Sequence, residues 1–339
     1  MKKVNIIAEI GVNHNGNVNL AKKMIRKAKK CGADIVKFQT LFADEFVKLD
    51  TKKVKYQLAN TSRKENHYQM IKKLELNKSD FIEIKKYCDK IKIEFLSTPY
   101  DLKSVALLED LKVKQYKVSS ADLVDMPLHK KILLTKKPVI LSVGMANIAE
   151  IKKTVEFYKK NKMSKITLLH CVSNYPCSAK SLNLKTIIRL KKLFNLPVGF
   201  SDHSKGNLAA ILSVGLGATV IEKHFTLDKS LPGPDHKASL TPREFSALVK
   251  TIRKAEIILG TDQKKCQLEE KETRRTMRKS ITLKQSMKRN QIIKESDLIM
   301  KRPGNNLIGQ KISLVIGKKL KKDLQKDHQL RLRDLNLIV

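Results

Sequence analysis

Tryptophan is absent from the 339-residue sequence, and aromatic residues make up only 5% of it. This scarcity argues against a surface for nucleic-acid bases, because such surfaces stack the bases on aromatic side chains. Five cysteines form an odd set, with no CxxC pair and none of the short spacings of a zinc finger. They fit a reducing compartment, and we expect a cytoplasmic protein.

Long hydrophobic runs are also missing. The longest weakly polar run, residues 209–221, contains two glycines. It is too short for a membrane-spanning helix, which needs about 18 residues. It is predicted to form a buried helix followed by a strand. The apolar stretch near the N-terminus is interrupted by Asn5 and Glu9, so it does not form the apolar part of a signal peptide. We therefore expect no membrane partner.

Charge is strongly one-sided, with a formal net charge of +37. Such an excess can attract nucleic acids or anionic membranes. However, only 12 of the 70 basic residues are arginine, the residue that planar recognition of bases and phosphates favours. The lysines are spread over nearly every helical segment. We interpret them as solvated helix faces that also steer an anionic substrate, and we expect no nucleic-acid partner.

Short β-branched runs alternate with amphipathic helical stretches along residues 1–262. Several runs are almost continuously apolar, as strands buried on both faces are. The predicted strands are residues 4–9, 34–38, 93–97, 115–118, 138–142, 166–170, 198–201 and 219–224. Eight such β-then-α units match the size of a (β/α)₈ barrel, the TIM barrel of the α/β class. An open doubly wound sheet is the alternative, but no GxGxxG follows the first run.

The composition changes after Gly260. Residues 263–279 are charged, lack a strong apolar period and are predicted to be a linker. Residues 280–339 contain short strand-like runs and turns, and they are predicted to form a small β-rich domain. A domain of about 60 residues buries too little apolar surface to be comfortably stable alone. We therefore expect it to dock on another surface.

In a (β/α)₈ barrel the active site lies where the strands end at their carboxyl side. The side chains there that could take part in chemistry are Glu9, Lys37, Gln39, Ser97, Thr98, Lys117, Ser120, Ser142, His170, Ser201, His203 and His224. His203 and His224 end neighbouring strands, so they could share one divalent cation and leave positions open for substrate oxygens. For His170 we expect a structural hydrogen bond.

Lys37 and Lys117 have two functional interpretations. One of them could form a Schiff base, as in a lysine-dependent aldolase, or both could be fixed charges for phosphate and carboxylate. Three serines nearby favour the second interpretation: Ser120, Ser142 and Ser201.

Six motifs in one order resemble the bacterial N-acetylneuraminate synthase family, over essentially the whole chain. They are AEIGVNHNG at residues 8–16, VKFQT at 36–40, FLSTP at 95–99, GFSDHS at 199–204, IEKHF at 221–225 and GPDH at 233–236. KRPG at 301–304 resembles the antifreeze-like SAF domain, a β-clip, of the same enzymes. The resemblance implies a TIM barrel followed by a SAF domain. It also implies a transferase that condenses phosphoenolpyruvate with an N-acetylated aminosugar to a sialic-acid-type sugar acid.

The resemblance further implies roles for individual residues. His203 and His224 match ligands of Mn²⁺ or Mg²⁺. Positions around the phosphate of phosphoenolpyruvate match Lys117, Ser120, Ser142, Ser173 and Ser201, with Lys37 in the same anionic pocket. Positions that hold the sugar or assist proton transfer match Glu9, Gln39, Tyr175 and Asp235. Asp122 matches an acid near the reacting carbons, so the expected catalytic residues are Glu9, Lys37 and Asp122.

Arg302 resembles the arginine that the family's SAF domain inserts into the partner subunit's active site to hold the N-acetyl group. This implies a domain-swapped homodimer, in which the small domain need not be stable alone. Three positions depart from the common pattern: Asp122 replaces a glutamate, Val143 a threonine, and Asn306 a second glycine. None of them is a predicted metal ligand.

N-acetylmannosamine is the expected acceptor sugar, because Tyr56-Gln57, Asn60-Thr61 and Gln69-Met70 resemble the sugar-side loop of the neuraminate enzymes. The alternative is an N,N'-diacetyllegionaminate synthase, which takes 2,4-diacetamido-2,4,6-trideoxymannose and shares much of that loop. Pseudaminate synthases are more distant. Other classes are disfavoured: paired histidines and serines argue against an aldolase, and intact barrel motifs argue against a non-catalytic sugar- or ice-binding protein.

Overall fold

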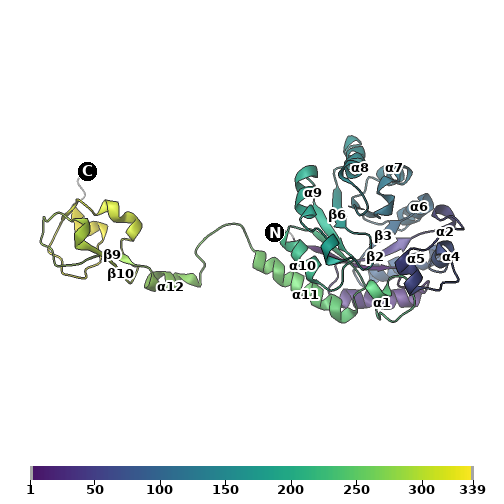
Figure 1. The fold of residues 1–339 in the computed structure, drawn as a ribbon, viewed down its shortest axis with the longest axis horizontal. Coiled ribbons are helices and arrows are strands. Elements are labelled where there is room, and N and C mark those ends of the chain that lie inside the picture. The colour runs from purple at the N-terminus through teal and green to yellow at the C-terminus, as the bar shows by residue number, and fades with distance from the viewer. Residues whose placement is uncertain (1–2, 337–339) are drawn as a thin grey trace. The chain divides into compact units, whose positions relative to one another are not determined.

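Eight parallel strands form the centre of the N-terminal part of the chain (Figure 1). They are β1 Asn5–Gly11, β2 Ile35–Thr40, β3 Glu94–Pro99, β4 Tyr116–Val118, β5 Val139–Ser142, β6 Ile166–Cys171, β7 Val198–Asp202 and β8 Val220–His224. Their lateral order is β3-β2-β1-β8-β7-β6-β5-β4. Because β3 also contacts β4, the sheet is a nearly closed barrel. The predicted TIM barrel is confirmed, and each strand begins and ends within two residues of its predicted position.

Helices follow the strands and pack around them (Figure 1). The longer ones are α1 Val18–Lys30, α5 Lys78–Lys90, α6 Leu102–Asp110, α7 Met126–Leu134, α8 Ile148–Lys160, α9 Thr186–Phe194, α10 Leu208–Gly215 and α11 Pro242–Leu259. Short helices α2 Ala43–Phe46, α3 Lys55–Asn60 and α4 His67–Lys72 lie in the segment between β2 and α5. Helix α8 begins where it does because Asn147 and Glu150 cap each other's backbone N–H groups.

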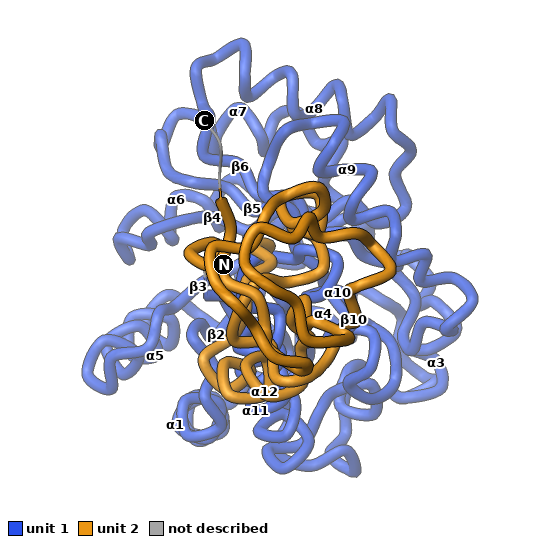
Figure 2. Tube along the Cα trace, turned by 90° about the vertical axis from the view of Figure 1, so that its left-hand side faces the viewer, with its two compact units in different colours: residues 1–261 blue, residues 262–339 orange. Residues whose placement is uncertain are grey.

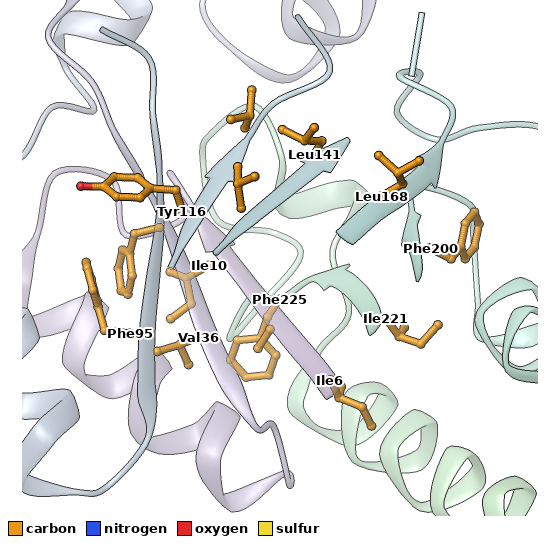
Figure 3. Packing of buried hydrophobic residues seen from close by; sticks show 14 of the residues in the cluster. Ile6, Ile10, Val36, Phe95, Tyr116, Leu141, Leu168, Phe200, Ile221 and Phe225 are labelled. Carbon is orange, nitrogen blue, oxygen red and sulfur yellow. The ribbon is translucent and has the colours of Figure 1, made fainter. Parts of the chain in front are cut away.

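The main apolar core lies between the strands and the surrounding helices. Figure 3 shows residues of this layer from every strand of the barrel and from the loop after β8, among them Ile6, Val36, Leu168 and Phe200. Successive side chains of a strand point to opposite faces, so the alternate residues point into the barrel. There a second, smaller cluster is formed by Ile7, Ile35, Leu96, Ile140, Leu169 and Val220. These side chains close the interior of the barrel below the strand ends.

The structure, a computed structural model, describes residues 3–336, and the chain divides into two units between Thr261 and Asp262 (Figure 2). In the second unit, β9 Ser280–Leu283 pairs antiparallel with β10 Leu298–Lys301, and β11 Lys319–Leu320 with β12 Leu335–Asn336. A separate apolar core includes Ile281, Ile293 and Leu330. The strands of this unit lie within residues 280–336, where the small β-rich domain was predicted. Residues 263–279, predicted to be a linker, contain helix α12 Glu270–Met277, which has no buried residue.

Every helix within residues 3–336 is too short or too polar to cross a membrane.

Candidate active site

A cavity of about 320 Å³ opens at the carboxyl ends of the barrel strands. The predicted site residues that line it are Glu9, Lys37, Gln39, Lys117, Ser120, Ser142, Ser173, Tyr175, Ser201, His203 and His224. They come together because β1, β2, β3, β5 and β8 each carry an inward apolar residue and, two positions later, an inward polar one. Ile7 is thus followed by Glu9, and Ile35 by Lys37.

Two lysines and two glutamates form a buried charge cluster in this cavity. Lys37 Nζ lies 3.0 Å from Glu9 Oε2 and 3.6 Å from Glu222 Oε2, and it donates to Thr98 Oγ1 at 3.2 Å. Lys117 Nζ donates to Ser142 Oγ at 2.6 Å. The cluster thus places two cationic groups where an anionic ligand could approach them.

The two glutamates differ in their affinity for a proton. Burial raises the pKa of Glu9 to about 7, although Lys37 opposes the rise. Burial would also raise the pKa of Glu222, but Lys117 and Lys37 together overcome it and lower the pKa to about 2. Glu222 is therefore a fixed carboxylate, whereas Glu9 can take up or release a proton near neutral pH.

A group of small polar side chains lies beside Lys117. Gly144 N donates to Ser120 Oγ at 3.0 Å, and Ser120 Oγ lies 2.9 Å from Cys171 Sγ. A Cβ atom on Gly144 would lie 2.5 Å from Ser173 Oγ and 2.7 Å from Cys171 Sγ. The absent side chain therefore leaves room for hydroxyl groups and a backbone N–H to converge, as in an anion-binding site.

The rings of His203 and His224 face one cavity, with their centroids 5.6 Å apart. His203 Nδ1 donates to Val172 O at 2.8 Å, so the lone pair of its Nε2 remains available. His224 Nδ1 is buried without a hydrogen-bond partner among residues 3–336, and Asp235 Oδ2 lies 3.8 Å from it. Burial lowers the pKa of His203 to about 4 and holds that of His224 well below its usual value of 6.5. Because both pKa values lie well below 7, both imidazoles are neutral at pH 7.

Tyrosine rings cover the histidines on one side. The ring centroid of Tyr175 lies 4.1 Å from that of His203 and 5.5 Å from that of His224. Tyr56, from helix α3, packs on Tyr175 with 5.0 Å between the centroids. Burial raises the pKa of Tyr175 well above its usual value, so its hydroxyl keeps its proton. These rings restrict access of water to the imidazoles.

Three predicted site residues do not line the cavity. Asp122 lies behind it, accepting a hydrogen bond from Ser119 Oγ at 2.6 Å, and burial raises its pKa to about 6. Asp235 is buried beside His224, and burial raises its pKa to about 6 as well. Arg302 belongs to the second unit, where its Nε donates to Met277 O at 3.0 Å.

Two further strand-end candidates have structural roles. His170 Nε2 donates to Leu182 O at 2.7 Å, as expected for a structural histidine. Ser97 Oγ and Thr40 Oγ1 are hydrogen-bonded at 2.7 Å, and neither residue lines the cavity.

Our sequence reasoning assigned no role to several residues that line the cavity, namely Ser119, Tyr100, Cys171 and Glu222. Glu222 could have been found, because it lies two residues before His224 on the same strand and must share its face. Tyr100 carries no such signal, because it follows β3 in a loop.

Within residues 3–336, no three His, Cys, Asp or Glu side chains gather closely enough to hold a metal ion by themselves. His203 and His224 could therefore supply two ligands, and the others would have to be water or substrate oxygens.

Comparisons with known proteins agree with this geometry. The sequence model of the NeuB family matches residues 24–264, and that of the SAF domain matches residues 278–336. The N,N'-diacetyllegionaminic acid synthase of Campylobacter jejuni is 44% identical over 98% of this chain and 100% of its own length. The N,N'-diacetyllegionaminic acid synthase of Legionella pneumophila is 43% identical over 94% of this chain and 91% of its own length. The crystal structure of N-acetylneuraminic acid synthetase from Leptospira borgpetersenii has 35% identity and a TM-score of 0.70, covering 80% of this chain and 90% of its own.

Proposed function

The chain belongs to the NeuB family, and we propose that it condenses phosphoenolpyruvate with 2,4-diacetamido-2,4,6-trideoxymannose and water to give N,N'-diacetyllegionaminate and phosphate. The observation that carries this proposal is the cavity that combines two buried lysines, a hydroxyl-lined cradle and two neutral imidazoles. Phosphoenolpyruvate carries a phosphate and a carboxylate. Lys117, Ser120 and the N–H of Gly144 suit the phosphate, and Lys37 suits the carboxylate.

A divalent cation, Mn²⁺ or Mg²⁺, fits the same cavity. The available lone pair of His203 Nε2 and the unpartnered Nδ1 of His224 support His203 and His224 as its protein ligands. When bound, such a cation supplies Lewis-acid activation of a carbonyl group. The low pKa values of both imidazoles keep them free of protons that would compete for it.

The residues of the cavity can then assist the bond changes. C3 of phosphoenolpyruvate forms a bond to the aldehyde carbon of the open-chain sugar, whose oxygen becomes a hydroxyl group. We assign the proton for that oxygen to Glu9, whose pKa of about 7 lets it hold one at neutral pH. The new C–C bond leaves a cationic centre at C2 of the donor, which the carboxylate of Glu222, and that of Glu9 once it has given up its proton, can stabilise.

Water adds to C2, and phosphate leaves by cleavage of the bond between C2 and the phosphate oxygen. We assign the uptake of the water's proton to Asp122. Its carboxylate does not reach the cavity, but Ser119 Oγ lines the cavity and lies 2.6 Å from Asp122 Oδ2. The serine hydroxyl can therefore pass the proton between them. The shorter aspartate side chain, in place of the family's glutamate, is compatible with this indirect route.

The choice of acceptor sugar follows the similarity of the relatives. The two N,N'-diacetyllegionaminic acid synthases are 44% and 43% identical to this chain, whereas the sialic acid synthetase from Leptospira is 35% identical. This favours the alternative sugar over N-acetylmannosamine, which the loop from Tyr56 to Met70 led us to expect. Both sugars carry an acetamido group at C2, so the cavity's basic chemistry is the same for each.

Release of phosphate from phosphoenolpyruvate tests the proposal. We expect release with the diacetamido sugar at least tenfold faster than with N-acetylmannosamine, abolition by EDTA, and restoration by added Mn²⁺. Faster release with N-acetylmannosamine would make the chain an N-acetylneuraminate synthase. No release with either sugar would refute the condensation.

We also propose that the active unit is a domain-swapped homodimer in which Arg302 of one subunit completes the site of the other. The proposal is supported by the lining of the cavity, whose residues all lie within residues 9–224 of the described chain and include no arginine that could hold an acetamido oxygen.

A further inference from the structure

Asp202 and Lys223 form an ion pair in which neither side chain is exposed to solvent, with 2.7 Å between Lys223 Nζ and Asp202 Oδ2. They lie opposite each other on β7 and β8. Lys223 Nζ also donates to Ser204 O at 2.6 Å. Asp202 Oδ1 accepts hydrogen bonds from Ser204 N at 2.8 Å and from Ser204 Oγ at 2.7 Å. Together these contacts join the end of β7, and Ser204 in the loop after it, to β8.

This ion pair lies directly behind the two histidines. His203 is between Asp202 and Ser204 in the chain, and His224 follows Lys223. Successive side chains of a strand point to opposite faces, so the ion pair is on the outer face of the barrel where the imidazoles are on the inner face. The pair therefore connects the same two strands that present His203 and His224 to the cavity.

Stability alone does not explain a charged pair at this place. Removing two charges from water is costly, and apolar side chains of similar volume often replace a buried ion pair with no loss of stability. An apolar pair, however, makes no hydrogen bonds and so cannot fix the direction of the backbone. The hydrogen bonds of Asp202 and Lys223 specify how the chain turns at His203, and His203 makes two directional contacts of its own. Its Nδ1 donates to Val172 O, and its backbone oxygen accepts from Cys177 N at 2.9 Å.

We propose that Asp202 and Lys223 are positioning residues, which set the separation and direction of the two imidazoles and thereby the affinity of the site for a divalent cation. The inference rests on the proposed function, because it takes His203 and His224 as the ligands. Outer contacts that orient ligating histidines commonly change metal affinity by about 10- to 100-fold when they are removed. Loss of the ion pair would leave both histidines in place but free to turn.

Isothermal titration of the metal-free, full-length protein with MnCl₂ tests this inference without using enzymatic activity. The variants are Asp202→Asn, Lys223→Met and the double variant Asp202→Leu/Lys223→Met. The double variant leaves no unpaired buried charge, so it should fold even where a single variant does not. Arg253→Met is the matched control. Arg253 also joins strand ends, donating to Val4 O at 2.8 Å and pairing with Asp34, but at the amino ends of β1 and β2.

We expect the double variant, and each single variant that folds, to bind Mn²⁺ at least about tenfold more weakly than the parent. Arg253→Met should bind within twofold of the parent. An affinity within twofold of the parent in the double variant would overturn the positioning role, as would an equal loss in Arg253→Met. A parent protein that binds no Mn²⁺, or binds it equally well after His203→Ala, would refute the proposed metal site itself.

Discussion

Lys37 Nζ lies 3.0 Å from Glu9 Oε2, and both side chains are almost completely buried. The same ammonium group also faces Glu222 at 3.6 Å. Glu222 has Lys117 as a second cationic neighbour, whereas burial dominates at Glu9. One lysine thus faces two carboxyl groups of which only Glu9 exchanges its proton near neutral pH. This division suits a site that must hold a fixed charge and move a proton at once.

Replacing Glu9 by Gln should remove the proton donor and keep the size of the side chain. We expect kcat to fall by about 10²- to 10⁴-fold, the usual contribution of a general acid or base. Steady-state phosphate release measures it. Glu94→Gln is the control, because Glu94 lies at the start of β3 and accepts a hydrogen bond from Gln115, away from the cavity. A higher KM for the sugar with unchanged kcat would mean that Glu9 only holds the substrate.

Replacing Gly144 by Ala should fill the proposed phosphate cradle. The new Cβ atom would lie 2.5 Å from Ser173 Oγ and 2.8 Å from Ser120 Oγ, so these hydroxyl groups must move. We expect KM for phosphoenolpyruvate to rise about tenfold or more, the loss of roughly one charge-assisted hydrogen bond. KM for the sugar should change little. Gly215→Ala is the control, because a Cβ atom there meets nothing within 4 Å. Equal effects of both variants would contradict the cradle.

Buried His14 should make the free energy of unfolding depend on pH. Burial lowers its pKa from 6.5 to about 4. As pH falls through this window, the unfolded chain binds a proton that the folded chain refuses, so the histidine's contribution to stability is lost. His14→Asn keeps an acceptor for Gly16 N, which now bonds to His14 Nδ1. We expect the free energy of unfolding of the parent, relative to that of the variant, to be about 3 kcal/mol lower at pH 4 than at pH 7.

Urea unfolding followed by circular dichroism measures that difference, since the chain lacks tryptophan as a fluorescent probe. His236 lies nearby, and burial lowers its pKa as well, but it is present in both proteins. A difference between parent and variant that stays constant from pH 7 to pH 4 would show that His14 does not titrate as described.

Arg302 should act in the site of the partner subunit. Lys117→Met inactivates the active site in the barrel of its own subunit. Arg302→Ala removes the arginine that its subunit contributes to the partner's active site. Co-expression of the two variants should restore up to about one quarter of the parent activity, because half of the dimers are mixed and each contains one intact site. Each variant alone is the control. Activity no higher than the sum of the two variants would exclude the exchange.

Much of the architecture could be predicted from local sequence patterns. The alternation of apolar strands with amphipathic helices was sufficient for the barrel, because the period of two in a strand and of 3.6 in a helix reflects which side of each element is buried. Polar residues at strand ends located the cavity for the same reason. His203 and His224 could be paired in advance, because consecutive strands of a (β/α)₈ barrel are neighbours.

The sequence by itself determined which residues point into the barrel and at which end of each strand they lie, because both follow from short-range periodicity. Only the tertiary structure decided which of them interact. Lys37 faces both Glu9 and Glu222, Asp122 lies behind Ser119, and Lys223 pairs with Asp202 across two strands. These contacts join segments that are far apart in the chain, so they depend on strand register and on closure of the barrel. No local pattern encodes such distances, and burial then sets the pKa values that the chemistry requires.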